Sequence, residues 1–361
     1  MRVAIVHDHL SFIGGGERVV LTLASALGAD LYATDVDPAL PKKAGFPDVR
    51  VKELAAVPQT PLLRQTRQAK AFHHAEIPPY DAYVFSGNWA IAAARDRHPN
   101  LWYCHTPVRV FYDLESTFLA GLSPAKRVAA RAWIRRTRPK YEANVADIDA
   151  IVANSRNVAG RVARYLRREA EVVYPPVDVS RYRFAKVGDA WLSVNRLSHE
   201  KRIALQVETF RRLPRERLVV AGGPGVGVDP EKFIRSLDPP ENVSFLGEVD
   251  EPRLLGLYAA CRGFLATAQD EDFGMTPVEA MASGKAVVAA DEGGYRETVV
   301  PGETGWLVPP TPAALAQAIG SATPEGLEAM RPRCEARAKE FDVGRFVAGM
   351  RERIERRVAA R

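Results

Sequence analysis

Short apolar runs alternate with helix-length amphipathic segments along the whole chain, and this alternation constrains the fold more than any other feature. Continuous apolar runs are typical of strands buried on both faces of a parallel sheet, and the segments between them supply crossover helices. In the first half, strands are expected at residues 3–6, 30–33, 82–85, 101–103, 151–153 and 172–173. In the second half, they are expected at residues 191–194, 218–221, 243–246, 263–266 and 286–289. The pattern predicts an α/β chain of two similar layered halves.

The length and a pair of prolines indicate where these halves divide. A chain of 361 residues is long enough for two domains of about 150 residues each. Pro175 and Pro176 can continue neither a strand nor a helix, and they favour an extended connector. We predict an N-terminal domain over residues 1–175, a C-terminal domain over residues 176–340 and a terminal helix over residues 341–361. The apolar residues of this helix at four-residue spacing are Phe346, Met350 and Ile354.

The composition excludes several classes of protein. With 47% hydrophobic and 26% charged residues, the chain can build sizeable cores and is not expected to be disordered. Its three cysteines, Cys104, Cys261 and Cys334, are far apart and fit neither a disulfide framework nor a zinc site, which favours a reducing cytoplasm. No run approaches about 18 apolar residues and the first residues lack a signal pattern. We therefore expect neither a membrane span nor secretion.

The net charge of +6 comes from one region. Residues 121–170 contain twelve Lys or Arg and only four acidic residues. Within this region, residues 123–140 are expected to form a basic amphipathic stretch, broken near Pro139, that could lie on an anionic membrane with Trp133 and Ile134 as anchors. A solvated helix face is the alternative. Nucleic acid is not expected as a partner, because only Trp133 and Tyr141 lie near the basic run as stacking aromatics.

A glycine-rich segment follows the first expected strand. Gly14, Gly15 and Gly16 precede a helix that is expected to begin near Glu17. Glycines there let the backbone approach a ligand, and the free N–H groups of a helix N-terminus attract phosphate. The spacing differs from the dinucleotide-binding fingerprint, because the glycines stand eight residues beyond the strand. A flexible connector is the alternative interpretation.

Two carboxylates flank the start of a second helix. Glu271 is expected on a loop, Thr276 as the N-cap before Pro277, and Glu279 in the first helical turn. Carboxylates accept hydrogen bonds from sugar hydroxyls, and a helix N-terminus stabilises a phosphate. The sequence therefore favours a sugar-phosphate site here. A capping box formed by Thr276 and Glu279 is the alternative.

Three further polar residues follow expected strands. Arg196 and Lys201 lie at the carboxyl end of the first strand of the second half, where ligands bind in open α/β sheets. Together they could clamp a diphosphate, although an exposed basic loop is the commoner reason for such a pair. His105 follows a strand of the first half, and it could hydrogen-bond a reacting sugar or serve as a structural histidine.

Taken together, these motifs resemble those of the family 4 retaining glycosyltransferases of the GT-B fold. The residues that carry the resemblance are GGGERV at 14–19, Asn154-Ser155, Arg196 with Lys201, and Glu271 with Glu279. The segments HDHL, GGGERVV and YCHTPVR look most like mannosyltransferases of polysaccharide or lipid-linked glycan assembly. The resemblance implies two Rossmann-like domains with parallel sheets facing across a cleft, and a terminal helix that crosses back to the N-terminal domain. The acceptor would bind mainly the N-terminal domain, and the nucleotide sugar mainly the C-terminal domain.

The resemblance also assigns roles to individual residues. The residues implied to hold the donor diphosphate are Arg196, Lys201, Thr276 and, from the N-terminal domain, Gly14 and Gly15. Those implied at the transferred sugar are Glu271, Phe273, Gly274, Met275 and His105. Glu279 is implied to bind the ribose, and the backbone around Val249 the base. The chain departs from many relatives after Lys201, where they carry glycine and this sequence has Arg202-Ile203.

The implied reaction is hexose transfer, with mannose from GDP-mannose as the first expectation and a UDP-sugar as the other donor considered. Charge develops on the departing diphosphate, so fixed cations and helix dipoles would lower the barrier without a metal or a resident cofactor. The acceptor is expected to be a hydroxyl of a glycan or of a lipid-linked acceptor. Another GT-B enzyme, such as a phosphorylase or a sugar-nucleotide epimerase, and a basic membrane-binding α/β protein are the alternatives. We expect a cytoplasmic enzyme that could be peripheral on the membrane face.

Overall fold

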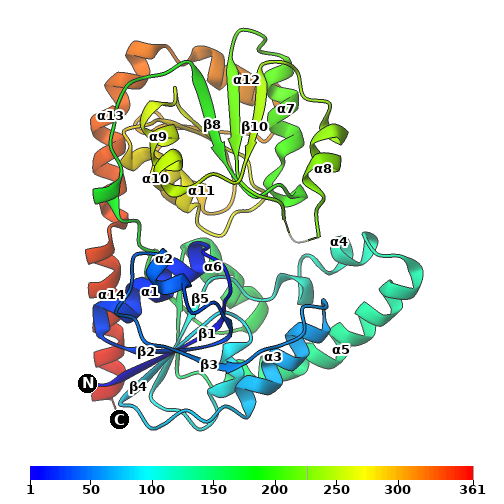
Figure 1. Cartoon of the computed structure of the whole chain (residues 1–361), viewed down its shortest axis with the longest axis vertical. Helices are drawn as coiled ribbons and strands as arrows, with labels where there is room; N and C mark the ends of the chain where they lie inside the picture. Colours follow the sequence, from blue (N-terminus) through cyan, green and yellow to red (C-terminus); the bar gives the residue numbers. More distant parts are fainter. Residues whose placement is uncertain (226, 361) are drawn as a thin grey trace. The chain divides into compact units, whose positions relative to one another are not determined.

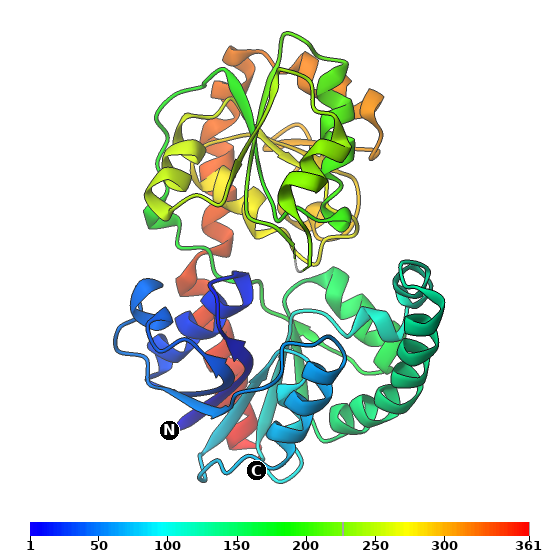
Figure 2. The same cartoon turned by 45° about the vertical axis from the view of Figure 1, so that its right-hand side comes forward.

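The computed structural model describes residues 1–225 and 227–360. The chain divides into two compact units (Figure 1). Unit 1 comprises Met1–Pro176 with Gly344–Arg361, and unit 2 comprises Val177–Val343. Each unit has a parallel sheet with helices on both of its faces, as Figures 1 and 2 show, so the predicted α/β fold class is confirmed.

The sheet of unit 1 has seven strands in the order β3-β2-β1-β4-β5-β6-β7. Its strands are β1 (Val3–Leu10), β2 (Asp30–Val36), β3 (Val51–Ala55), β4 (Ala82–Ser86), β5 (Asn100–Cys104), β6 (Ala150–Ala153) and β7 (Glu171–Val172). The central strands are buried on both faces, as their continuous apolar runs require. The connections change direction between β1 and β4, which makes the carboxyl ends of these two strands the switch point of the sheet.

Helices cover this sheet on two faces. They are α1 (Gly15–Leu27), α2 (Leu40–Lys43), α3 (Leu63–His73), α4 (Glu115–Ala120), α5 (Pro124–Ala146), α6 (Arg156–Arg161) and α14 (Val343–Ala359). Short turns are η1 (Ala90–Ala93), η2 (Arg109–Phe111) and the π-helical η3 (Val162–Leu166). β1 contributes Ala4 and Val6 to the core that contains Ile134 of α5, and Val3 and Ile5 to the opposite core. That opposite core contains the apolar face of α14, made of Phe346, Met350 and Ile354.

Unit 2 has a six-stranded parallel sheet in the order β10-β9-β8-β11-β12-β13. Its strands are β8 (Ala190–Val194), β9 (Arg217–Ala221), β10 (Val243–Gly247), β11 (Phe264–Ala266), β12 (Val287–Ala290) and β13 (Gly305–Val308). Its helices are α7 (Ile203–Arg211), α8 (Pro230–Leu237), α9 (Glu251–Ala260), α10 (Met275–Ala282), α11 (Tyr295–Thr298), α12 (Pro312–Ser321) and α13 (Pro324–Ala338). The short turns are η4 (Val179–Arg181), η5 (His199–Lys201) and η6 (Lys339–Phe341). The switch point of this sheet lies between β8 and β11.

Each of the eleven predicted strands overlaps an observed one, but some bounds were wrong. β1 continues to Leu10 instead of ending at Val6, because partners from other segments satisfy its polar residues. α1 begins at Gly15 and not near Glu17, since the N–H of Arg18 already donates to the carbonyl of Gly14 at 3.1 Å. The edge strands β3 and β13 were not predicted, because neither has a long buried apolar run.

The basic stretch of unit 1 also differs from its prediction. α5 is one continuous helix that contains Pro139, instead of a helix broken there. The carbonyl of Arg135 loses its helical donor, but both residues are exposed, so water can hydrogen-bond this carbonyl. Ile134 is buried in the core, and Trp133 Nε1 donates to Thr66 Oγ1 of α3 at 2.9 Å. Ile134 is therefore not available as a membrane anchor, and that part of the prediction was wrong, whereas Trp133 is half-buried and lies against α3.

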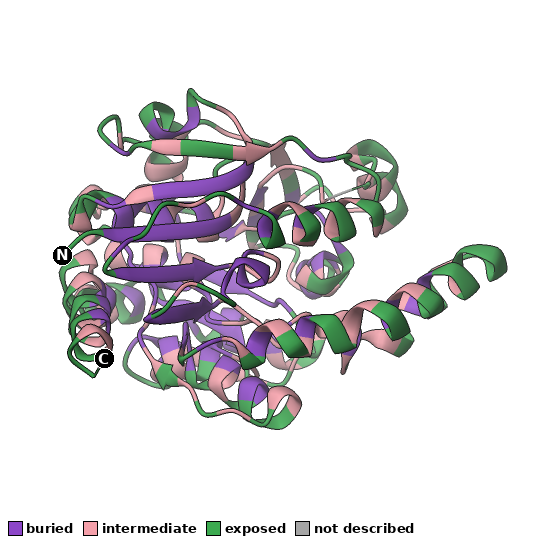
Figure 3. Ribbon diagram, turned by 90° about the horizontal axis from the view of Figure 1, so that it is seen from below, coloured by how far each residue is buried: buried purple, intermediate pink, exposed green. Residues whose placement is uncertain are grey.

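Much of α5 is nevertheless exposed. Figure 3 shows exposed residues along the outer part of this helix, and Val128 is its most exposed large apolar residue. Within residues 1–225 and 227–360, no helix has both the length and the apolar character needed to cross a membrane. The three cysteines are buried, and none of them forms a disulfide within the part of the chain that the structure describes.

Candidate functional site

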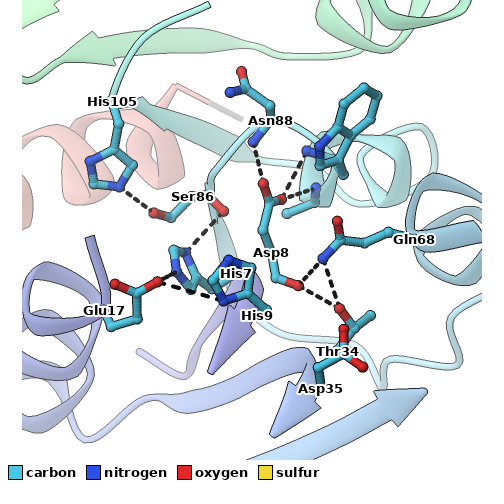
Figure 4. A network of polar contacts seen from close by, with 12 residues as sticks. His7, Asp8, His9, Glu17, Thr34, Asp35, Gln68, Ser86, Asn88 and His105 are labelled. Atoms are coloured by element: carbon cyan, nitrogen blue, oxygen red, sulfur yellow. Dashed lines mark hydrogen bonds and ion pairs between the residues drawn. The ribbon is translucent and has the colours of Figure 1, made fainter. Parts of the chain in front are cut away.

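Polar side chains gather at the switch point of unit 1, where β1 and β4 end (Figure 4). The carboxylate of Asp8 accepts hydrogen bonds from the backbone N–H groups of Asn88, Trp89 and Ala90, each at 2.8 Å. A Cβ at Gly87 would lie 2.4 Å from the Asp8 carboxyl carbon, so only glycine lets β4 turn this closely around the carboxylate. Asp8 therefore fixes the start of η1 relative to β1.

Glu17 of α1 lies between two histidines of β1. Its Oε1 is 3.8 Å from His7 Nε2 and 3.6 Å from His9 Nδ1, and both Glu17 and His7 are buried (Figure 4). Burial raises the pKa of Glu17, but the close approach of His7 and the charges of the two histidines outweigh it and hold this pKa below its usual value. Burial is also the main reason why the pKa of His9 is lowered, although Glu17 opposes that effect. The cluster can hold a negative charge at Glu17 and hydrogen-bond a polar ligand through His9.

His105 joins this cluster from the end of β5. Its Nε2 is 2.9 Å from Ser86 Oγ, and its ring packs edge-on against Tyr103 (Figure 4). Burial, together with the charge of neighbouring His7, lowers the pKa of His105 to about 4, although Glu17 opposes this shift. The imidazole is therefore neutral at physiological pH and can exchange hydrogen bonds with a hydroxyl.

The glycines at the start of α1 border the same cluster. Gly14 is the N-cap and has no side chain to cap the helix, and Gly15 is exposed in the first turn. A Cβ at Gly14 would lie 2.6 Å from Glu17 Oε2, and one at Gly16 would lie 3.7 Å from the His105 ring. The glycines thus leave uncapped N–H groups beside the histidines, which is the arrangement that an anionic or hydroxyl-rich ligand needs.

The dipeptide Asn154-Ser155 serves a local structural role. Ser155 is the N-cap of α6, and its Oγ accepts from the N–H of Val158 at 3.0 Å. Its hydroxyl also donates to Asn154 Oδ1 at 3.1 Å. Both residues are buried, so the dipeptide fixes the turn between β6 and α6.

In unit 2, the loops after β8 and β11 are joined at the switch point of the sheet. The N–H of Gln269 donates to the carbonyl of Glu200 at 2.7 Å, and Thr267 Oγ1 donates to the carbonyl of Lys201 at 3.1 Å. These bonds hold together two segments that are almost seventy residues apart in the sequence.

The same two loops bring a cation and a carboxylate together. Lys201 Nζ donates to Glu271 Oε2 at 2.7 Å, and both side chains are about one-fifth exposed. Arg196, in the same loop as Lys201, is exposed and forms no ion pair with any of the described residues. The structure therefore places two cations and one carboxylate at the carboxyl ends of β8 and β11, the position at which ligands bind in this kind of sheet.

Arg202 occupies the position where glycine was expected from the resemblance. Its φ of 51° lies in the left-handed region, which explains why glycine would suit the position. Its guanidinium binds Glu292 at 2.5 Å, and Glu292 Oε1 also accepts from the N–H of Asp270 at 3.0 Å. The arginine side chain thus connects the loops after β8, β11 and β12 and offsets the cost of its own backbone conformation.

The loop from Glu271 to Gly274 lies directly against a pair of glycines. The N–H of Gly294 donates to the carbonyl of Glu271 at 2.7 Å, and a Cβ at Gly293 would lie 2.6 Å from that residue's backbone. Gly274 has a φ of 91°, and a Cβ there would meet the Tyr295 ring at 2.9 Å. The Phe273 side chain is buried, which leaves only its backbone to meet a ligand.

The start of α10 differs from its prediction. Gly274 is the N-cap and Met275 begins the helix, so Thr276 is the second helical residue and Glu279 lies beyond the first turn. The prediction of Thr276 as the N-cap and the alternative capping box of Thr276 with Glu279 were therefore both wrong. The backbone turns at Gly274 instead, because glycine readily adopts a φ of 91°. Glu279 Oε2 instead accepts from Tyr258 OH of α9 at 2.7 Å. This bond directs the carboxylate toward α9.

Val249, the residue implied to lie near the base, is on another loop of unit 2. It is in the loop between β10 and α9, directly before Asp250, whose side chain caps α9 by accepting from Arg253 N. The residue is half-buried.

The unit 1 cluster contains polar residues that were not predicted from the sequence. They are His7, Asp8, His9, Glu17 and Ser86. Two signals could have found part of the set: three polar residues in a row at the end of an apolar strand, and a Glu directly after three glycines. Among the residues that the structure describes, no group of three or more His, Cys, Asp or Glu side chains could hold a metal ion.

Comparison with known families matches both units. The family model described as Glycosyltransferase Family 4 matches residues 13–181, and the model described as Glycosyl transferases group 1 matches residues 183–341. The first match lies in unit 1 except for its last few residues, the second lies in unit 2, and together they cover most of the chain.

Curated relatives point in the same direction. The alpha-1,3/1,6-mannosyltransferase ALG2 of Homo sapiens is 28% identical over 258 residues, which are 63% of this chain and 59% of ALG2. The lipopolysaccharide core biosynthesis mannosyltransferase LpcC of Rhizobium leguminosarum bv. viciae is 46% identical over 68 residues, or 19% of each protein. The similarity therefore spans about three-fifths of the length of human ALG2.

Solved structures of similar shape cover the chain more fully. Sucrose-phosphate synthase from Thermosynechococcus elongatus superposes with a TM-score of 0.77 at 20% identity, covering 100% of both chains. HepE from Anabaena, in complex with UDP and glucose, gives 0.73 at 19% identity, covering 98% of this chain and 99% of its own. At these identities the likeness shows the fold, two Rossmann-like units of the GT-B type.

Proposed function

Because this chain belongs to family 4 of the GT-B glycosyltransferases, we propose that it transfers a hexose from a nucleotide sugar to a hydroxyl of a glycan or lipid-linked acceptor. Mannose from GDP-mannose is the favoured donor, because ALG2 and LpcC are both named as mannosyltransferases. A UDP-sugar is the other donor to test, since HepE was crystallised with UDP-glucose. We also propose that the enzyme acts in the cytoplasm, at a membrane face if its acceptor is lipid-linked.

The donor would bind at the carboxyl ends of β8 and β11. Arg196 is exposed there, and Lys201 belongs to the same loop. The planar guanidinium of Arg196 can form paired hydrogen bonds with the diphosphate, and the ammonium of Lys201 can bind it as a point charge. The N-terminus of α10 follows at Met275 and Thr276 and offers backbone donors to a phosphate or to the sugar. Glu271 would accept hydrogen bonds from the sugar hydroxyls, and Glu279 from the ribose, with the base near Val249.

The reaction that we propose retains the anomeric configuration. The anomeric C–O bond to the diphosphate breaks, the acceptor oxygen bonds to the same face of the sugar, and the acceptor proton passes to a donor phosphate oxygen. Positive charge at Arg196 and Lys201 stabilises the departing diphosphate. His105, neutral at physiological pH, would hydrogen-bond the sugar or the acceptor hydroxyl, and Gly14 and Gly15 would approach the phosphate with their backbone.

The observation that carries the proposal is the pair of cations, Arg196 and Lys201, in the loop after β8 at the switch point of unit 2. Removing one charge-stabilising donor from comparable sites lowers kcat by about 10²–10³. We therefore expect Arg196→Ala to lose turnover by that order while it keeps the fold. Arg217→Ala is the matched control, because Arg217 is an exposed arginine at the amino end of β9, on the opposite edge of the same sheet.

The assay uses purified protein with GDP-mannose, UDP-glucose and ADP-glucose, and follows nucleotide release together with the anomeric configuration of the product by NMR. Near-normal turnover in Arg196→Ala would overturn the assignment of the diphosphate site. An inverted product would reject the retaining mechanism. Formation of a sugar 1-phosphate from an added glycan and inorganic phosphate would identify a phosphorylase. Interconversion of nucleotide sugars would identify an epimerase.

A further inference from the structure

A groove on unit 1 is not used by the proposed reaction. It lies between α3 and α5 with η1 at its floor, and it has a volume of about 740 Å³. Such a volume is typical of small-ligand sites, which measure about 300–1,000 Å³. Eight of its fifteen lining residues are alanine, tryptophan or tyrosine. The small side chains of Ala69 of α3 and of Ala129 and Ala132 of α5 leave space between the two helices. Trp89 and Trp133 supply large apolar surfaces to the same groove.

The charged residues that line the groove are all basic. Lys70 of α3 and Arg136 and Lys140 of α5 are among the lining residues, which include no acid. The two helices that form the walls contain ten Lys or Arg, and Glu142 is their one acidic residue. Glu142 binds Arg138, so it neutralises none of the three groove cations. An anionic group at the groove would therefore meet uncompensated positive charge.

The floor of the groove is hydrogen-bonded to the polar cluster of unit 1. Tyr141, a lining residue, donates from its OH to Asn88 Oδ1 at 3.2 Å. Asn88 and Trp89 in turn donate their backbone N–H groups to Asp8 (Figure 4). A molecule in the groove would thus contact Tyr141 and Trp89, which are connected by these hydrogen bonds to Asp8 at the switch point of the sheet.

These observations point to one kind of ligand. The apolar walls suit a hydrocarbon chain, and the three cations suit a phosphate attached to that chain. We propose that the groove between α3 and α5 binds the lipid portion of a phosphate-bearing amphiphile, with its chain along the alanines and tryptophans and its phosphate at Lys70, Arg136 and Lys140. This assignment rests on the proposed function, since it makes the amphiphile the carrier of the acceptor.

The binding test uses the full chain without donor and three soluble probes below their aggregation limits. Dodecyl phosphate has the chain and the anionic head, dodecyltrimethylammonium has the same chain with a cationic head, and inorganic phosphate has no chain. Titration calorimetry measures affinity, and quenching by a chain-brominated dodecyl phosphate reports its approach to Trp89 and Trp133. We expect dodecyl phosphate to bind at least about tenfold more tightly than either other probe and to quench the fluorescence.

Two matched pairs of variants on α5 locate the binding. Ala132→Glu puts a carboxylate into the groove, and Ala125→Glu puts one on the same helix outside it. Lys140→Glu and Lys126→Glu make the same charge change inside and outside the groove. We expect the two groove variants to weaken dodecyl phosphate binding by about tenfold or more, and the two others to change it less than about twofold.

The other outcomes overturn the proposal. Equal affinity for the cationic amphiphile would show that the head group is not recognised, and binding of inorganic phosphate alone would show that no chain is bound. Binding to anionic vesicles without binding of monomeric dodecyl phosphate would indicate a membrane-contact surface instead of a groove site. Thermal stabilisation by nucleotide sugars tests the donor site separately: stabilisation without amphiphile binding removes the groove and leaves the proposed function standing. Amphiphile binding without donor binding or transfer removes the function and the acceptor role.

Discussion

At the scale of single residues, His105 shows how burial selects a protonation state. Its pKa of about 4 compares with 6.5 for an unperturbed histidine, and burial is the main cause. Between these values the unfolded chain binds a proton that the folded chain does not bind. The free energy of unfolding is therefore highest above pH 6.5 with respect to this group, and falls by up to about 3 kcal/mol as the pH drops to about 4.

A variant at this position tests the effect. His105→Gln keeps a polar group within reach of Ser86 but cannot titrate. We expect the free energy of unfolding to decline less steeply between pH 6.5 and 4 in the variant than in the natural chain. Urea denaturation at a series of pH values measures the two slopes, and identical slopes would show that His105 is not the group responsible.

Glu17 also loses its contribution to stability in acid, but in a lower pH range than His105 because its pKa starts from that of a carboxyl group. Its pKa is lowered by His7 and His9 in spite of burial, so its contribution to stability is present above its unfolded pKa and is lost as the pH falls through the folded one. Glu17→Gln should lower the free energy of unfolding at pH 7 by about 1–3 kcal/mol, because a buried charged partner is removed. The deficit should shrink in acid below about pH 4.5. Denaturation of Glu328→Gln, an exposed glutamate of α13, provides the control, and a deficit that is constant with pH would contradict this explanation.

Some residues of the candidate site could be predicted and others could not. Lys201 and His105 were selected because each follows an apolar run, and in a parallel sheet the carboxyl ends of the strands share one edge. Glu271 was selected because it and Glu279 flank the expected start of a helix. The contact between Lys201 and Glu271 could not be predicted, since it joins residues seventy positions apart. Asp8 was missed for the same reason: its partners lie eighty residues away, after β4.

At the scale of elements, the loop between β11 and α10 depends on the glycines that follow β12. Gly293 has a φ of 56°, and a Cβ there would lie 2.6 Å from the backbone N and O of Glu271. We expect Gly293→Ala to displace this loop, lower the free energy of unfolding by more than the roughly 1–2 kcal/mol that the left-handed conformation alone costs, and weaken donor binding. Chemical denaturation and donor-induced thermal shifts measure the two effects.

Gly302→Ala separates the clash from the backbone strain. Gly302 has a φ of 77°, but a Cβ there would meet nothing within 4 Å. This variant should lose about 1–2 kcal/mol of stability and keep its donor affinity. If both glycine variants bound the donor equally well, the packing of the Glu271 loop on Gly293 would not matter for the site.

Elements could be predicted to the extent that burial sets their sequence pattern. Strands such as β4 and β5 are buried at every position, and the apolar run identifies them. β3 was missed because it is an exposed edge strand with Lys52 and Glu53 at its centre. Pro139 was expected to break α5, but its exposed position makes the lost hydrogen bond tolerable.

At the scale of the whole molecule, the basic region reports on the surface of one unit. The excess positive charge of residues 121–170 lies in unit 1, and much of it is on α5. Composition could reveal this excess, but not that Ile134 is buried or that Trp133 faces α3, because those facts depend on which side of the helix meets the core. The charge therefore identifies a surface, and only the packing identifies the groove within it.

The last helix belongs to the unit in which the chain begins, and this has a consequence for stability. Met350 of α14 is fully buried in the core that also contains Val3 and Ile5 of β1. Truncating a buried methionine to alanine costs about 2–5 kcal/mol. We expect Met350→Ala to destabilise unit 1 by this amount, while Glu355→Ala, an exposed change on the same helix, has little effect. Hydrogen exchange should become faster at the amides of β1 and remain unchanged at those of β8. Equal acceleration in both strands would mean that the two units unfold as one.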